Sequence, residues 1–263
     1  MSEVKARYLV GLTATPHRRD GHHPIAEMQL GPIRFAVDPK SQTAGRPFER
    51  SLIIRETGFQ MNGAQPQGGI QDLYRALAHN QARNRLILDD VLRAIEEGRS
   101  PIVLTERKDH LDFIADQLRN FVRHVVVLRG GVTAKDRRDL TAQIAAISDQ
   151  EERLILATGR YIGEGFDDAR LDTLFLALPI SWKGTLVQYT GRLHRLHPRK
   201  TEVRIFDYVD REVPMLLRMF EKRLKTYQAI GYARGEVPLG YAEPIEEPIV
   251  EYDDEAHRCC GDR

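Results

Sequence analysis

The stretch Pro101–Leu128 reads PIVLTERKDHLDFIADQLRNFVRHVVVL. Its two ends, Ile102–Thr105 and His124–Leu128, are short apolar runs rich in β-branched residues, which is typical of buried strands. The longer stretch between them, Arg107–Asn120, has the amphipathic pattern of a helix. A strand, a helix and a second strand in succession predict a βαβ unit and therefore a parallel sheet.

The same alternation continues along the chain as far as residue 230. Three more strands are predicted at Arg153–Ala157, Thr173–Ala177 and Glu202–Tyr208, and three more helices at Thr133–Ile147, Lys183–His194 and Glu212–Ile230. Repeated βα units form a doubly wound sheet with helices on both faces. We therefore predict an α/β fold over residues 99–232. It has three layers, α/β/α, and the middle layer is a mainly parallel sheet.

The residues before this region are less regular. Strands are predicted at Tyr8–Leu12 and at Arg50–Glu56, and Asn62–Gly69 is expected to be a flexible link because of its Gly and Gln content. A helix is then predicted over Ile70–Glu97, with Gly98 as its stop signal.

Composition and charge set broad limits. With 263 residues, 41% of them hydrophobic, the chain can bury a core. No apolar run reaches the length of a membrane span and no secretory signal is present, so we expect a cytoplasmic protein without a membrane partner. Residues 233–263 hold nine of the 38 acidic and three of the 39 basic residues, so this tail has a charge near −6 and the rest near +7. The tail is expected to be disordered.

The basic excess is compatible with a polyanionic partner, although a scattered excess of this size is also ordinary solvated surface. The only two cysteines, Cys259 and Cys260, and the histidines His22 and His23 beside Asp20 lack the companion ligands of a metal site. We expect no metal centre.

The most informative stretch for chemistry is Gln188–Arg195, which reads QYTGRLHR. An α-helix turns by about 100° per residue, so Gln188, Arg192 and Arg195 fall within about 60° of one another on the predicted helix. Two guanidinium groups beside an amide suit an anion with several oxygens, such as a triphosphate. A basic solvent-facing helix is the alternative.

This stretch resembles the sixth motif of superfamily 2 helicases. Ala157–Asp167, ATGRYIGEGFD, is similar to their fifth motif, and Tyr8–Pro16, YLVGLTATP, to their third. The continuation His17–Gly21 resembles the branch that contains excision-repair helicases and type III restriction motor subunits. The resemblance covers about residues 7–21 and 99–210.

The resemblance implies roles for particular residues. Arg195, assisted by Arg192 and Gln188, is expected to be catalytic as an arginine finger, and Thr13 and Thr15 to couple the ATP site to the nucleic acid. The residues expected to bind ATP are Gly165, Asp167, Gln188, Arg192 and Arg195.

Weaker similarities concern the nucleic-acid track. Pro101–Arg107 resembles the fourth motif, and the turn Leu128–Gly131 is followed by the basic residues Lys135, Arg137 and Arg138. Backbone amides and basic side chains contact phosphates in nucleic-acid complexes. The residues expected to bind nucleic acid, DNA in preference to RNA, are Thr105, Arg107, Gly130, Arg137, Thr158 and Gly159.

Two parts of such a motor are missing from the sequence. It contains neither the phosphate-binding loop G-x-x-x-x-G-K-[ST] nor an acidic D-E-x-[HD] box that would hold magnesium. We therefore expect residues 1–60 to be the end of a first helicase lobe, 61–98 a linker and helical connector, and 99–232 a RecA-like second lobe. ATP with Mg²⁺ would be used only when an N-terminal lobe, in cis or in trans, completes the site.

Other functions remain open on the sequence alone. The chain could be a non-catalytic nucleic-acid-binding or regulatory remnant of such a helicase, which would share every motif above. An upstream reading frame that encodes the phosphate-binding loop would favour the motor. An unrelated α/β enzyme, such as a nucleotide-sugar transferase, would need a sugar-donor site that the sequence does not present.

Overall fold

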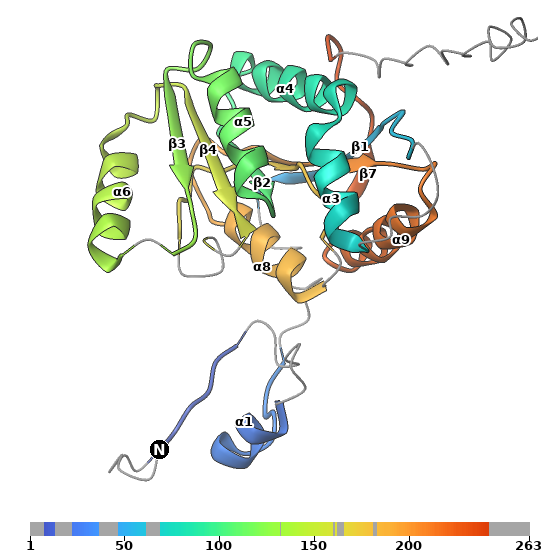
Figure 1. Ribbon diagram of the computed structural model, residues 1–263. Helices are drawn as coiled ribbons and strands as arrows, with labels where there is room; N and C mark the ends of the chain where they lie inside the picture. The colour runs from blue at the N-terminus through green and yellow to red at the C-terminus, as the bar shows by residue number, and fades with distance from the viewer. Residues whose placement is uncertain are drawn as a thin grey trace, which may run out of the picture.

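The structure, a computed structural model, has a central sheet flanked by helices (Figure 1). It describes residues 8–13, 23–36, 47–61, 69–131, 133–159, 161, 166–180 and 183–241. The sheet and its helices occupy the upper part of Figure 1, and helix α1 lies apart from them at the bottom.

Seven strands form one sheet in the order β3-β4-β2-β5-β6-β1-β7. The strands are β1 (Glu49–Glu56), β2 (Pro101–Thr105), β3 (His124–Leu128), β4 (Arg153–Thr158), β5 (Thr173–Leu176), β6 (Glu202–Val209) and β7 (Ala233–Gly235). Every neighbouring pair is parallel. The predicted α/β class with a parallel sheet is confirmed.

Helices cover both faces of this sheet. The helices described beside the sheet are α3 (Ile70–His79), α4 (Gln81–Glu96), α5 (Lys108–Leu118), α6 (Ala134–Ala146), α8 (Lys183–Leu193) and α9 (Pro214–Ala229), whereas α1 (His23–Leu30) lies apart from it (Figure 1). Side chains of α6, α8 and α9 join the hydrophobic cluster on one face, and those of α4 and α5 join the cluster on the other. The three-layer α/β/α arrangement is therefore confirmed.

The central strands are apolar on both sides because both faces are covered. Every residue of β2, β4 and β5 is buried. Successive side chains of a strand point to opposite faces, so Ile102 packs in one cluster and Val103 in the other. This explains why these strands appear in the sequence as continuous apolar runs.

The helix predicted over Ile70–Glu97 is two helices, α3 and α4. Asn80 separates them: it caps the end of α3, and its side chain accepts a hydrogen bond of 2.8 Å from the backbone N–H of Arg83 at the start of α4. An Asn side chain that caps a new helix competes with the continuous helical path. Helix α4 is also part of the core rather than a loose connector, since Ile87 and Val91 are fully buried.

Two expectations for the N-terminal part need correction. The strand expected at Arg50–Glu56 exists as β1, but it lies between β6 and β7 in the same sheet as the rest, rather than with residues of a first lobe. Leu52 and Ile53 point to opposite faces and are both buried, which requires an interior position. The sheet domain therefore begins by residue 49.

The segment Tyr8–Leu12 is not a strand. A strand needs a neighbouring backbone for its hydrogen bonds and a cover for its side chains, and none of the seven described strands pairs with it. Its large apolar side chains are between 44% and 92% exposed. Gly11 lies close to α1, since an added Cβ there would be 2.5 Å from Cδ1 of Leu30.

Candidate functional site

An ion pair joins the stretches that resemble the fifth and sixth motifs. The Nε of Arg195 donates to Oδ1 of Asp167 at 3.2 Å. The two side chains are 54% and 45% exposed. Exposed pairs of this kind contribute only about 0–1 kcal/mol to stability. The fold therefore depends little on this ion pair.

Helix α8 carries the other two predicted catalytic residues. Leu186, Tyr189 and Leu193 anchor its inner side in the core, whereas Gln188 and Arg192 are half-buried. The helical face shared by Gln188 and Arg192 is thus the one turned away from the tightly packed side.

Arg195 is not on that helix, which ends at Leu193. Its backbone N–H donates to the carbonyl of Arg192 at 3.4 Å, in a turn that closes the helix. Pro198 explains this end, because it has no N–H for the carbonyl of His194 and disfavours the helical conformation of the residue before it. The prediction of three residues on one helical face therefore applies to two of them.

A second group of predicted residues lies at the carboxyl ends of β2, β3 and β4. The backbone N–H of Gly130 donates to Oγ1 of Thr158 at 3.1 Å, which joins the ends of β3 and β4. Both residues were predicted to face nucleic acid. The contact shows that the Thr158 hydroxyl serves the protein itself, since Thr158 is buried.

Thr105 is also buried. Its Oγ1 lies 3.1 Å from Nδ1 of His110 and accepts a hydrogen bond of 3.4 Å from the backbone N–H of Arg107. The Arg107 guanidinium forks onto the carboxylate of Asp109, with contacts of 2.9 and 2.5 Å. Thr105 thus shapes the turn that carries Arg107, and its own hydroxyl is turned inward.

Gly159 follows β4 at a place with no room for a side chain. An added Cβ would overlap the hydroxyl of Tyr189 and lie 2.5 Å from Oε1 of Glu106. The pKa of Tyr189 is raised by its burial and by the nearby Glu106 carboxylate. Glycine therefore lets α8 and the turn after β2 close over the end of β4.

Glu106 and Tyr189 were not predicted as site residues. Nothing in their local sequence indicates that they meet, because they come from segments more than 80 residues apart.

The remaining predicted residues have separate places. The Arg137 guanidinium lies over the ring of Tyr161, 5.5 Å from its centroid, so it is packed against the protein. Thr13 is exposed in the irregular segment before α1. Gly165 and Thr15 lie outside the described residues.

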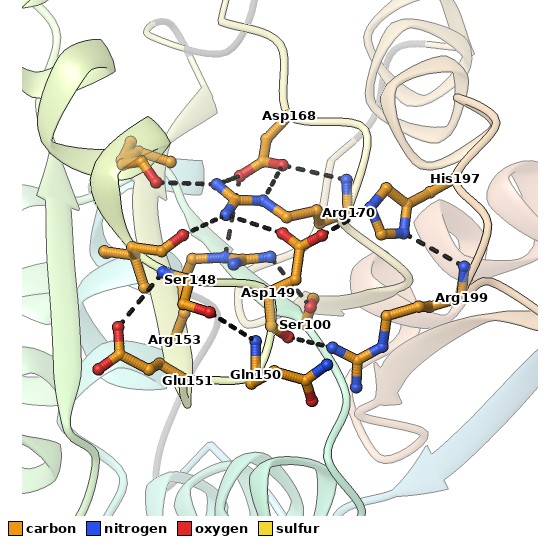
Figure 2. A network of polar contacts seen from close by, with 12 residues as sticks. Ser100, Ser148, Asp149, Gln150, Glu151, Arg153, Asp168, Arg170, His197 and Arg199 are labelled. Carbon is orange, nitrogen blue, oxygen red and sulfur yellow. Dashed lines mark hydrogen bonds and ion pairs between the residues drawn. The ribbon is translucent and has the colours of Figure 1, made fainter.

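A polar network fixes the backbone beside Asp167 (Figure 2). Arg170 donates to both oxygens of Asp168, at 2.9 and 3.0 Å, and to the carbonyls of Ile144 and Ile147 at 2.8 and 2.7 Å. Burial by itself raises the pKa of Asp168, but the hydrogen bonds from Arg170 and the charge of Arg153 together bring that pKa below its usual value.

The same network reaches the segment after Arg195. Asp149 lies 3.3 Å from Arg170 and 3.3 Å from Nε2 of His197, and its carbonyl accepts a hydrogen bond from Arg199. Figure 2 shows these side chains gathered around Asp149 and Asp168. The two backbone segments that carry Asp167 and Arg195 are therefore tied together.

Within the part of the chain that is described, no group of three or more His, Cys, Asp or Glu side chains is arranged to hold a metal ion. None of the helices in these ranges is long and apolar enough to cross a membrane.

Comparisons with known proteins agree with this fold. No family model matches the sequence. A protein named "Putative helicase 161L" from Invertebrate iridescent virus 6 is 28% identical over 241 residues, which cover 87% of this chain and 51% of that protein. The chain thus spans about half the length of this relative.

Solved structures show the same architecture. T4 UvsW superposes with a TM-score of 0.55 at 16% identity, covering 73% of this chain and 42% of that one. S. cerevisiae Dbp5 bound to RNA and ADP BeF3 gives 0.51 at 14% identity, covering 83% and 49%. The sequence is therefore similar to that of a putative helicase, and the sheet domain shares its fold with parts of T4 UvsW and of S. cerevisiae Dbp5.

Proposed function

We propose that this chain is the second lobe of an ATP-dependent nucleic-acid helicase or translocase, and that it supplies an arginine finger to ATP held by another lobe. The observation that carries the proposal is the Arg195–Asp167 pair, which is exposed beside Gln188 and Arg192. A guanidinium that is not needed for the core can exchange its carboxylate partner for a phosphate.

The donor set fits ATP. The guanidinium groups of Arg192 and Arg195 match phosphate oxygens with paired N–H groups. The Asp167 carboxylate can accept hydrogen bonds from ribose hydroxyls. Mg²⁺ and the cradle for the β- and γ-phosphates would come from the partner lobe, since this sequence has no phosphate-binding loop.

The carboxyl ends of β2, β3 and β4 are the proposed track for the nucleic-acid backbone. The turns there bring Arg107, Gly130 and Gly159 to one edge of the sheet. The buried hydroxyls of Thr105 and Thr158 would hold these turns in shape rather than contact phosphate. Contacts to the backbone of a nucleic acid give affinity without sequence preference.

The N-terminal segment is the proposed contact with the first lobe. Residues 8–12 and 24–36 expose a series of large apolar side chains: Tyr8, Val10, Leu12, Met28, Ile33 and Phe35. Apolar side chains gathered in this way usually face another protein surface. A first lobe that adds a sheet beside Tyr8–Leu12 would cover them.

Reconstitution tests the proposal. The chain is mixed with a candidate first lobe, a polypeptide that carries the phosphate-binding loop and the acidic box, and ATP hydrolysis is measured with and without DNA or RNA. We expect hydrolysis stimulated by nucleic acid only when both polypeptides are present. Steady hydrolysis by this chain alone would contradict the proposal, and binding of nucleic acid without hydrolysis in any mixture would favour the non-catalytic alternative.

A further inference from the structure

A buried lysine holds the end of α8. Lys200 is 6% exposed, and its Nζ donates to the carbonyl oxygens of Leu193 and Arg195, each at 2.8 Å. Carbonyls at the end of a helix lack the backbone N–H partners that they have inside it. A cation there also interacts favourably with the negative end of the helix dipole. Lys200 thus fixes the backbone that carries the Arg195 side chain.

Aromatic side chains complete this support. The ring centroid of Phe48 lies 5.8 Å from Nζ of Lys200. The ring of His194 stacks on Tyr232 with centroids 5.6 Å apart, and its Nε2 is 2.9 Å from the Tyr232 hydroxyl. Phe48 precedes β1 and Tyr232 follows α9, so neither belongs to the motif-like stretches. His194, which precedes Arg195, and Lys200, which follows it in the chain, are therefore both held by buried partners.

The charge of Lys200 needs an explanation. Moving an ammonium group out of water costs several kcal/mol unless hydrogen bonds replace the lost hydration. An apolar side chain of similar length could fill the same space without this cost. The two carbonyls supply hydrogen bonds of this kind, and one of them belongs to Arg195 itself.

We propose that Lys200 is a positioning residue for Arg195. By holding the carbonyls of Leu193 and Arg195, it directs the exposed Arg195 side chain toward Asp167 and toward the nucleotide that the proposed function places there. The inference rests on that proposed function for its effect on catalysis, but the orientation of Arg195 is a property of this chain alone.

The first test uses Lys200→Met in the reconstituted two-lobe complex. Methionine keeps the length of the side chain and removes the donor, so kcat for ATP should fall by about 10- to 100-fold, as expected for a misplaced catalytic group. The KM for ATP and the affinity for nucleic acid should stay unchanged. Lys200→Arg, which keeps a cation, should recover part of the loss, and Lys225→Met, at an exposed lysine of α9, should have no effect.

A double-mutant cycle separates positioning from general damage. If Lys200 acts through Arg195, adding Lys200→Met to Arg195→Ala should not slow the reaction further. An additional loss equal to that of Lys200→Met alone would overturn the inference while leaving the proposed function intact. If the Arg195→Ala complex hydrolysed ATP at the wild-type rate, the proposed function would be refuted instead.

A measurement on the isolated chain decides the structural part in either case. In a ¹⁵N-arginine NMR spectrum, the Arg195 Nε–H that donates to Asp167 should give a distinct signal, identified by its loss in Arg195→Ala. Lys200→Met should shift this signal to the position of arginines without a carboxylate partner, and Lys225→Met should not. An unshifted Arg195 signal in a folded Lys200→Met chain would overturn the inference.

Discussion

The imidazole of His110 lies 3.1 Å from the hydroxyl of Thr105, inside the protein. Its other nitrogen, Nε2, is 3.0 Å from Oδ1 of Asn84, whose Nδ2 donates to the carbonyl of Ala78 at 2.8 Å. Oδ1 of Asn84 can only accept, so Nε2 of His110 carries the proton and Nδ1 accepts from Thr105. The turn after β2 is thereby connected to α4 through a neutral histidine.

This arrangement predicts a dependence of stability on pH. Burial is the main cause that lowers the pKa of His110 from 6.5 to about 3. Between these values the unfolded chain binds a proton at this residue that the folded chain does not. The free energy of unfolding should therefore fall as the pH decreases below 6.5, by up to about 1.4 kcal/mol per pH unit from this group.

The measurement is urea unfolding at a series of pH values from 4 to 7. His110→Asn removes the titrating group and should flatten this part of the profile, although it lowers stability at pH 7. An unaltered slope in His110→Asn would contradict the account.

Gly159→Ala should destabilise the protein. The new methyl group would overlap the Tyr189 hydroxyl, and relieving such a contact in a packed region costs about 1–3 kcal/mol. In a Tyr189→Phe background the hydroxyl is absent, so the same substitution should cost less. Equal costs in the two backgrounds, measured by urea unfolding, would show that Tyr189 does not restrict this position.

The buried pair Arg55–Asp90 should matter for stability. Arg55 donates to both oxygens of Asp90, at 2.9 and 3.0 Å, and both side chains are almost fully buried. Arg55→Met leaves the buried Asp90 carboxylate without its charged partner, although the Tyr208 hydroxyl still donates to it at 3.0 Å, and should lower the free energy of unfolding by about 3–5 kcal/mol.

The matched control is Arg75→Met, which breaks the exposed pair with Asp72 and should change stability by less than about 1 kcal/mol. Similar losses in the two variants would contradict this explanation.

The sequence predicted the central strands well. The runs at residues 102–105 and 153–157 are β2 and β4 within one residue, because a strand buried on both faces is apolar over most of its length. The start of α6 was also predictable, since Thr133 and Asp136 form a capping box.

Relations between distant segments could not be predicted in this way. Arg50–Glu56 was recognised as a strand, but the place of β1 between β6 and β7 depends on pairing with residues about 150 positions away. The split between α3 and α4 depends on whether Asn80 caps or continues a helix, and both are compatible with its local sequence.

The candidate site was also predictable only in part. Its residues could be identified from three motif-like stretches, and the structure brings two of these stretches into contact at Arg195 and Asp167. The contact of Glu106, Gly159 and Tyr189, and the support of Arg195 by Lys200, depend on the packing of the turns. Sequence periodicity holds no information on such contacts.

The rate of ATP hydrolysis by the two-lobe complex with Arg195→Ala tests the central claim most directly. An arginine finger contributes on the order of 10³- to 10⁵-fold to phosphoryl transfer, so kcat should fall by at least about 10³-fold while the complex still forms. Arg218→Ala, at an exposed arginine of α9, should retain the wild-type rate. An Arg195→Ala complex that hydrolyses ATP as fast as the wild type would contradict the account.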